Sequence, residues 1–375
     1  MSISANEPGQ GGGTTARPAS AGRSPSGQEG LLAVAAGLVA RGKGILAADE
    51  TVPTLTRRFE ALGIPSTQDS RRAYREMLFT APAAADVISG VILQDETIRQ
   101  SASSGVPFPQ LLAAQGIVPG IKVDTGAKPL AGWPGETVTE GLDGLRDRLA
   151  EYRGLGAHFA KWRAVIRIGD GRPSRACVEA NAHALARYAA LCQEQNLVPI
   201  VEPEVLMDGA HGIGICEDVT DAVLAAVFRA LHGQGVVLEA MLLKPNMIVP
   251  GEDCPEPAAI HEVAAATLRC LRRQVPAAVP GIIFLSGGQD ARLATAHLNE
   301  INRLPGAKPW TISFSYGRAL QDAALTAWGG LDENLPSGRE ALALRARCNG
   351  AASLGAYSDE MEQARPNAAQ HRHDH

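Results

Sequence analysis

Short apolar runs alternate with amphipathic stretches along most of the chain. Eight runs rich in apolar or β-branched residues begin 30 to 43 residues apart. The stretches between them have helical periodicity, as in residues 218–232, where the apolar positions fall on one face and Gly233 follows as a stop signal. The predicted strands are residues 44–49, 87–93, 120–124, 159–168, 198–204, 240–246, 281–287 and 311–317.

Strands that alternate with helices imply a parallel sheet. Eight such units within about 300 residues fit a closed barrel. The sequence therefore predicts an α/β fold, a single (β/α)8 TIM barrel with flexible N- and C-terminal tails. An open doubly wound sheet is the structural alternative. A final helix is expected to start at a capping box made by Ser337 and Glu340.

The two ends differ in composition from the body. Residues 1–28 are dominated by Gly, Ser, Pro, Thr and Ala, and such a segment cannot offset its own ordering entropy. We therefore expect a disordered tail over residues 1–28, a barrel over 29–350 and a flexible tail over 351–375. The first segment lacks the apolar stretch of a secretory signal, so we expect a cytoplasmic protein, with an organelle transit peptide as the alternative.

Composition narrows the possible partners. Hydrophobic residues make up 45% of the chain, aromatic residues 4%, and the net charge is −5. The negative charge and the few aromatic rings argue against a nucleic-acid partner. No apolar run reaches about 18 residues, which argues against a membrane span. The six cysteines form no CxxC pair and the histidines no HExxH pair, so we expect no metal site and no cofactor.

Polar residues end most of the predicted strands, at the barrel end where such folds carry their chemistry. A charge inside a barrel is costly unless it is paired. Each charge alone could simply be solvated just past its strand, but their recurrence favours a catalytic cluster. In chain order the residues are Asp49, Gln94 with Asp95, Lys122, Lys161 with Arg163, Glu202 with Glu204, Lys244, Ser286, and Ser315 with Arg318.

Lys244 has the most apolar surroundings of the three strand-end lysines, within EAMLLKPNM. Desolvation and neighbouring lysines both disfavour an ammonium group, so we expect a neutral amine that can form a Schiff base with a carbonyl. Glu202 and Glu204, two residues apart on one strand face, would supply the proton transfers that an imine requires. A structural ion pair with Glu202 or Asp49 is the alternative, and spacing alone does not choose between Lys244 and Lys161.

Two glycine-containing segments at the ends of the last two strands indicate phosphate binding. They are SGGQ at 286–289 and SYGR at 315–318. The loops after strands seven and eight are the usual phosphate site of such barrels. Backbone N–H groups of Gly287, Gly288 and Gly317 could converge on phosphate oxygens, with Ser286 and Arg318 as further donors. Two tight turns without a ligand are the alternative.

The motif set as a whole resembles class I fructose-bisphosphate aldolase of the animal and plant type. The matching segments are GKGILAADE, GIKVD, FAKWR, VPIVEPE, LLKPN, FLSGGQ, KPW and FSYGRALQ, and they span about residues 30 to 350. The resemblance implies reversible cleavage of fructose 1,6-bisphosphate to dihydroxyacetone phosphate and glyceraldehyde 3-phosphate through a lysine Schiff base, as in glycolysis. It also implies a sugar-phosphate substrate, no metal, and a homo-oligomer, usually a tetramer.

The resemblance implies a role for each site residue. Lys244 is the Schiff-base lysine, Glu202 the principal acid and base with Glu204 in support, and Asp49 and Lys161 complete the catalytic cluster. The residues implied to bind the substrate and its phosphates are Lys122, Arg163, Thr51, Thr54, Arg58, Ser286, Gly287, Ser315, Gly317 and Arg318.

The chain departs from the family pattern in three places. Thr51 and Thr54 stand where the family has serines, and Pro53 is expected to stiffen that loop. The second strand continues with LQDET rather than FHET. The chain ends in HRHDH rather than the family's tyrosine, and its nearest tyrosine is Tyr357. We therefore expect intact carbon–carbon cleavage, with protonation of the enamine slower or differently assisted.

Two other function classes stay open from the sequence. One is a Schiff-base barrel that acts on another phosphorylated carbonyl substrate, such as a transaldolase or a dehydratase. The other is a non-catalytic scaffold that retains the barrel. The sequence also leaves open whether fructose 1,6-bisphosphate or fructose 1-phosphate is preferred.

Overall fold

The computed structural model describes residues 25–82, 84–169 and 171–363. Its main sheet is a closed barrel of parallel strands in the order β1–β10–β9–β8–β7–β6–β3–β2. Each predicted run overlaps one of these strands, so the barrel is confirmed and the open sheet is excluded. The strands are β1 (Gly44–Ala47), β2 (Ile88–Leu93), β3 (Val118–Lys122), β6 (Phe159–Ile166), β7 (Val198–Val205), β8 (Leu242–Leu243), β9 (Gly281–Phe284) and β10 (Thr311–Tyr316).

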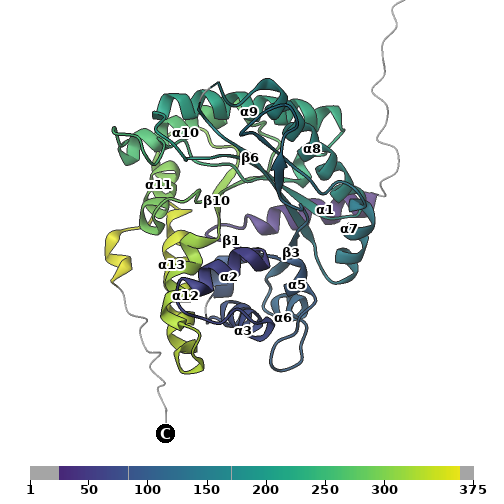
Figure 1. Ribbon diagram of the computed structural model, residues 1–375, viewed down its shortest axis with the longest axis vertical. Coiled ribbons are helices and arrows are strands. Elements are labelled where there is room, and N and C mark those ends of the chain that lie inside the picture. The colour runs from purple at the N-terminus through teal and green to yellow at the C-terminus, as the bar shows by residue number, and fades with distance from the viewer. Residues whose placement is uncertain (1–24, 83, 170, 364–375) are drawn as a thin grey trace, which may run out of the picture.

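Helices surround the barrel (Figure 1). They are α1 (Pro25–Leu38), α2 (Val52–Glu60), α3 (Gln68–Phe79), α4 (Ala84–Val87), α5 (Asp95–Ile98), α6 (Phe108–Ala114), α7 (Leu145–Gly154), α8 (Arg175–Glu194), α9 (Ile213–Gly233), α10 (Ile260–Gln274), α11 (Ala291–Arg303), α12 (Arg318–Trp328) and α13 (Leu335–Ala352), with 3-10 turns η1 (Leu238–Ala240), η2 (Asp332–Asn334) and η3 (Asp359–Glu362). The apolar face predicted within 218–232 is buried in α9. No helix among the described residues is both long enough and apolar enough to cross a membrane.

Helix α1 closes one end of the barrel, and the purple ribbon in Figure 1 crosses the strands there. Its Leu31, Ala35 and Leu38 belong to an apolar cluster that includes Phe159 and Val198, the first residues of β6 and β7. The plug therefore lies at the N-terminal ends of the strands. The opposite, C-terminal end is left for the polar side chains.

Close packing of this plug requires glycine on the inward face of some strands. A Cβ atom on Gly120 of β3 would lie 2.2 Å from the Phe159 ring, and one on Gly281 of β9 would lie 2.4 Å from Val39. Real Cβ atoms do not approach other heavy atoms so closely, so any side chain here would displace the barrel core.

Three details of the fold differ from the sequence-based expectations. Helix α13 begins at Leu335, with Pro336 in its first turn, so the start expected at Ser337 is wrong; proline at this position already has the helical φ angle. Residues 25–28 form the start of α1 rather than part of a tail. Strands β4 (Ala127–Pro129) and β5 (Thr137–Thr139) form an antiparallel hairpin that the patterning did not reveal.

The segment beyond residue 350 is also partly folded. Its Tyr357 is buried, and the Tyr357 backbone N–H donates a hydrogen bond to Asn299 of α11. Glu362 of η3 forms an ion pair with Arg345 of α13. The expected C-terminal tail therefore cannot begin at 351. Residues 1–24 and 364–375, and with them the changed C-terminal sequence, lie outside the described residues, so the tail assignments remain predictions there.

Candidate active site

A cavity of 710 Å³ opens at the C-terminal ends of the barrel strands. Every residue to which the family resemblance gave a role in catalysis or substrate binding lines it. These are Asp49, Thr51, Thr54, Arg58, Lys122, Lys161, Arg163, Glu202, Glu204, Lys244, Ser286, Gly287, Ser315, Gly317 and Arg318. The strand-end pattern therefore predicted residues that the fold brings together from all but one of the barrel strands.

Strand register explains why these side chains meet. Lys122 of β3 is paired with Lys161 of β6, and Arg163 of β6 with Glu202 of β7. Paired residues on neighbouring parallel strands point to the same face, and alternate residues share that face. Glu204 consequently projects to the same side as Glu202, into the cavity.

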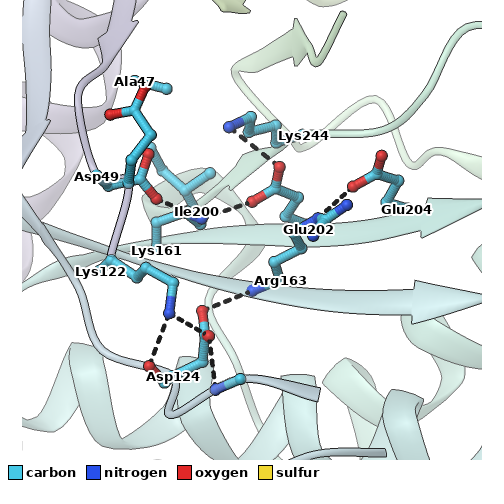
Figure 2. A network of polar contacts seen from close by, with 12 residues as sticks. Ala47, Asp49, Lys122, Asp124, Lys161, Arg163, Ile200, Glu202, Glu204 and Lys244 are labelled. Carbon is cyan, nitrogen blue, oxygen red and sulfur yellow. Dashed lines mark hydrogen bonds and ion pairs between the residues drawn. The ribbon is translucent and has the colours of Figure 1, made fainter. Parts of the chain in front are cut away.

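Buried charged side chains that line the cavity form a cluster (Figure 2). The Lys161 Nζ lies 2.6 Å from an Asp49 carboxylate oxygen and 3.1 Å from Glu202 Oε2. The Lys244 Nζ lies 3.1 Å from the other oxygen, Glu202 Oε1. Glu202 thus bridges the two lysines, and Lys244 is only 3% exposed.

The charges within this cluster hold one another ionised. Burial opposes the ionisation of Asp49, but the positive charges of Lys161 and Lys244 outweigh it and lower the pKa of Asp49 to about 2. The same balance of burial against both lysines lowers the pKa of Glu202. Burial also opposes the charge on Lys161, but Asp49 and Glu202 raise its pKa above the usual range. Lys161 therefore remains a cation, flanked by two carboxylates.

A second set of ion pairs lines the wall of the cavity beside this cluster. Arg163 pairs with Glu204, as Figure 2 shows. The Lys122 Nζ lies 2.5 Å from Asp124 Oδ1, and Asp124 Oδ2 accepts a hydrogen bond from the Arg163 backbone N–H. Asp124 was not predicted, although its position two residues after Lys122 places both on one strand face.

Backbone donors gather where β9 and β10 end. Gly287 and Gly288 have φ angles of 64° and 102°, which favour glycine, and the Gln289 N–H closes the turn on the Ser286 carbonyl. Within the described residues, the N–H groups of Gly287 and Gly288 make no backbone hydrogen bond. A Cβ atom on Gly288 would lie 3.5 Å from the Arg318 guanidinium, so the turn and that arginine face each other. The arrangement suits a phosphate group.

The first turn of α2, which follows β1 beside β10, forms another part of the cavity rim. The Thr51 and Thr54 hydroxyl oxygens lie 3.0 Å apart, and Arg58 pairs with Glu50 and Asp322. Pro53 lies in the first helical turn of α2 and not in a loop. In that turn the missing N–H of proline costs nothing, because it would have no partner within the helix. The exposed N–H groups of this helix start and the Arg58 side chain can hold a second anion.

Some polar residues do not have the place that the sequence suggested. Gln94 accepts a hydrogen bond from the Glu96 backbone N–H, and Asp95 accepts hydrogen bonds from Arg99 and Tyr152. Both residues therefore stabilise α5 and its neighbours and do not line the cavity. Conversely, Glu50, Arg57 and Asp124 line the cavity without having been predicted. Among the described residues, no group of three or more His, Cys, Asp or Glu side chains is arranged to hold a metal ion.

Comparisons with known proteins show the family to which the chain is similar. A family model described as fructose-bisphosphate aldolase class-I matches residues 30–375. The chain is 57% identical over 330 residues to a probable fructose-bisphosphate aldolase class 1 of Xanthomonas axonopodis pv. citri, covering 88% of this chain and 98% of the relative. It is 51% identical over 332 residues to the cytosolic fructose-bisphosphate aldolase 4 of Arabidopsis thaliana, covering 88% and 84%.

A solved structure is similar in three dimensions as well as in sequence. It is that of fructose-bisphosphate aldolase from Plasmodium falciparum in complex with TRAP and a small-molecule inhibitor. The TM-score is 0.88 at 46% sequence identity, with 89% of this chain and 97% of that chain covered.

Proposed function

Because the chain belongs to the class I fructose-bisphosphate aldolase family, we propose that Lys244 is the amine that captures the substrate ketone. The enzyme is a carbon–carbon lyase of glycolysis that reversibly cleaves fructose 1,6-bisphosphate to dihydroxyacetone phosphate and glyceraldehyde 3-phosphate. The roles of individual residues in that reaction are the substance of the proposal.

The observation that carries the assignment is the different pairing of the two central lysines. Lys161 is held between Asp49 and Glu202, whereas Lys244 shares only the Glu202 carboxylate in this cluster. Transfer of one proton from Lys244 Nζ to Glu202 Oε1, 3.1 Å away, would give a neutral amine and a protonated acid at the same time. Both are what the first steps require.

The reaction then proceeds with one proton shared between these two groups. The Lys244 amine adds to the C2 ketone to give a carbinolamine, and protonated Glu202 gives its proton to the C2 hydroxyl, which leaves as water. The resulting iminium ion is an electron sink. Ionised Glu202 next takes the proton of the C4 hydroxyl, the C3–C4 bond breaks, and its electron pair forms the enamine. Glyceraldehyde 3-phosphate leaves, and protonation at C3 followed by hydrolysis releases dihydroxyacetone phosphate and Lys244.

The neighbouring charges support these steps. Asp49 orients the C4 hydroxyl, and the Lys161 cation stabilises negative charge that develops on the reacting oxygens. Glu204 and Arg163 form the adjoining wall. Donors fixed before the substrate arrives need no reorganisation during the reaction, which is why a preformed ion-pair cluster suits this chemistry.

We assign one phosphate to each of these two parts of the cavity rim. The C1 phosphate binds the N–H groups of the Gly287 turn and of Gly317, with Ser286, Ser315 and Arg318 as side-chain donors. The C6 phosphate binds the start of α2 through Thr51 and Thr54, with Arg58 and Lys122. Binding at both ends holds the ketose so that C2 faces Lys244, and this remote binding energy orients the reacting bonds.

Two further properties are proposed from the family. The protein acts in the cytoplasm, as relatives named as cytosolic or cytoplasmic isozymes suggest. It assembles as a homo-oligomer, a tetramer by family resemblance, which light scattering of the purified protein would test.

The assignment of Lys244 is tested by Lys244→Arg, which keeps a cation near Glu202 but cannot form a neutral nucleophile. We expect cleavage of fructose 1,6-bisphosphate to be abolished in a coupled assay. Lys128→Arg is the matched control, because Lys128 is exposed on β4. This variant should retain full activity. Appreciable cleavage by Lys244→Arg would transfer the role of nucleophile to Lys161.

A further inference from the structure

The chain leaves β1 just before Asp49. At that point its hydrogen-bonding partner on the β10 side changes from a strand to a helix side chain. The β1–β10 pairing ends at Leu46, because β10 turns into α12 at Gly317. The next carbonyl, that of Ala47, accepts a hydrogen bond of 2.6 Å from the Nε2 atom of Gln321. A side chain of α12 therefore takes the place of a strand neighbour at the end of β1.

Gln321 is itself fixed from the other side. It is fully buried, and its Oε1 atom accepts a hydrogen bond of 3.0 Å from the Tyr74 hydroxyl. Arg75 Nη1 donates to the same oxygen at 3.4 Å. With its oxygen facing two donors, the amide must present its N–H group to the Ala47 carbonyl.

The residue after Asp49 is anchored by Arg75, the arginine that also contacts Gln321. Glu50 forms an ion pair with Arg75, whose Nη2 atom lies 2.8 Å from the Glu50 carboxylate, and Glu50 also pairs with Arg58. Asp49 thus lies between two anchored neighbours, Ala47 through Gln321 and Glu50 through Arg75. Its carboxylate is held 2.6 Å from Lys161.

We propose that Gln321 is a positioning residue for carbon–carbon cleavage: by holding the Ala47 carbonyl, it fixes the direction of the Asp49 carboxylate toward the C4 hydroxyl. The inference rests on the role proposed above for Asp49. Displacement of a reacting group by about 1 Å can cost on the order of 100-fold in rate. Dihydroxyacetone phosphate has no C4 hydroxyl, so the exchange of its C3 proton through the enamine does not depend on Asp49.

The test compares these two reactions in Gln321→Glu. This variant keeps the size of the side chain and an acceptor for Tyr74, and its carboxylate, ionised beside Arg75, offers no donor to Ala47. We expect kcat for fructose 1,6-bisphosphate cleavage to fall roughly 10- to 100-fold, while proton exchange on dihydroxyacetone phosphate changes by less than about threefold. Tyr74→Phe loosens Gln321 without removing its donor, so it should lower the ratio of cleavage to proton exchange by a smaller factor.

Gln193→Glu is the matched control. Gln193 is also fully buried, and its Nε2 atom donates to the Val237 and Ala240 carbonyls, near the first residues of β7 and β8 and away from the cavity. The control should lose stability without changing the ratio of cleavage to exchange. An equal loss of both reactions in Gln321→Glu, or no loss of either, would overturn the proposal. If that variant does not fold, an unchanged ratio in Tyr74→Phe would overturn it.

Asp49→Asn separates this inference from the proposed function. If Asp49→Asn loses cleavage selectively and the Gln321 and Tyr74 variants do not, only the inference about Gln321 fails. If Asp49→Asn keeps the normal ratio, the role assigned to Asp49 fails first, and the positioning role of Gln321 fails with it.

Discussion

At the scale of single residues, the function depends on how one carboxylate is shared. Glu202 touches both central lysines, through a different oxygen for each. The same group can therefore exchange a proton with Lys244 while Lys161 and Asp49 keep their charges. In the proposed mechanism Glu202 acts in several steps, so we expect its loss to affect turnover more than binding.

Glu202→Gln tests this role. It keeps the shape of the side chain but removes proton transfer, so we expect kcat to fall about 100- to 10,000-fold with a much smaller change in KM. Steady-state kinetics with fructose 1,6-bisphosphate measures it. Glu217→Gln is the control, since Glu217 of α9 pairs with Arg269 and Arg273 of α10 and does not line the cavity. Equal losses in the two variants would contradict the account.

The charge cluster also predicts how stability depends on pH. The folded protein lowers the pKa of Asp49 from 3.8 to about 2, so its ionised form contributes stability that is complete above pH 4 and is lost as the pH falls toward 2. Thermal unfolding of the native protein and Asp49→Asn should therefore differ most near pH 6. The difference should shrink below pH 4, whereas a constant difference down to pH 3 would contradict the assignment.

Sequence reasoning found the residues proposed to carry chemistry more readily than those that hold them in place. Lys244 and Glu202 stand out because charge at the end of an apolar strand is unusual. Glu50 and Gln321 have no such signal, because their importance comes from partners such as Arg75, which are distant in the sequence. Only the fold brings these partners together.

At the scale of elements, the end of the barrel away from the cavity is sealed by α1. Glycines on the inward faces of β3 and β9 leave room for Phe159 and for the residues at the end of α1. The strands were predictable because each apolar run is short and bounded. The position of α1 as a plug was not predictable, because any helix that covers a sheet has a similar apolar face. Only closure of the barrel shows that the apolar face of α1 lies inside it.

Gly120→Ala tests this packing. The new Cβ would lie 2.2 Å from the Phe159 ring, so we expect a loss of roughly 1–3 kcal/mol or more in the free energy of unfolding. Denaturant unfolding measures it. Gly214→Ala in α9, where a Cβ meets nothing within 4 Å, should leave stability unchanged or raise it. A Gly120→Ala protein as stable as the native one would show that the core can relax around the clash.

At the scale of the whole molecule, the charge of the cavity opposes that of the chain. The chain has a net charge of −5, yet seven basic and five acidic residues line the cavity, two more positive charges than negative. A cleft of opposite sign attracts an anionic substrate even when the protein as a whole repels it. The sequence predicted many of these charges, but their local balance follows only from the folded lining.

Ionic strength should therefore distinguish substrates by charge. Salt screens exposed charges over about 10 Å at 0.1 M and over less at higher concentrations. We expect added salt to raise KM for fructose 1,6-bisphosphate more than KM for fructose 1-phosphate, which lacks the second phosphate. An equal rise for both would argue against a separate phosphate site at the start of α2.

The most direct test of the central claim is to trap the covalent intermediate. The enzyme is treated with borohydride in the presence of dihydroxyacetone phosphate, which reduces a Schiff base to a stable amine, and the modified peptide is identified by mass spectrometry. The account predicts a single adduct, on the peptide that contains Lys244. It should form equally well with and without a chelator, and it should not form in Lys244→Arg. An adduct on Lys161, or no adduct while cleavage proceeds, would contradict it.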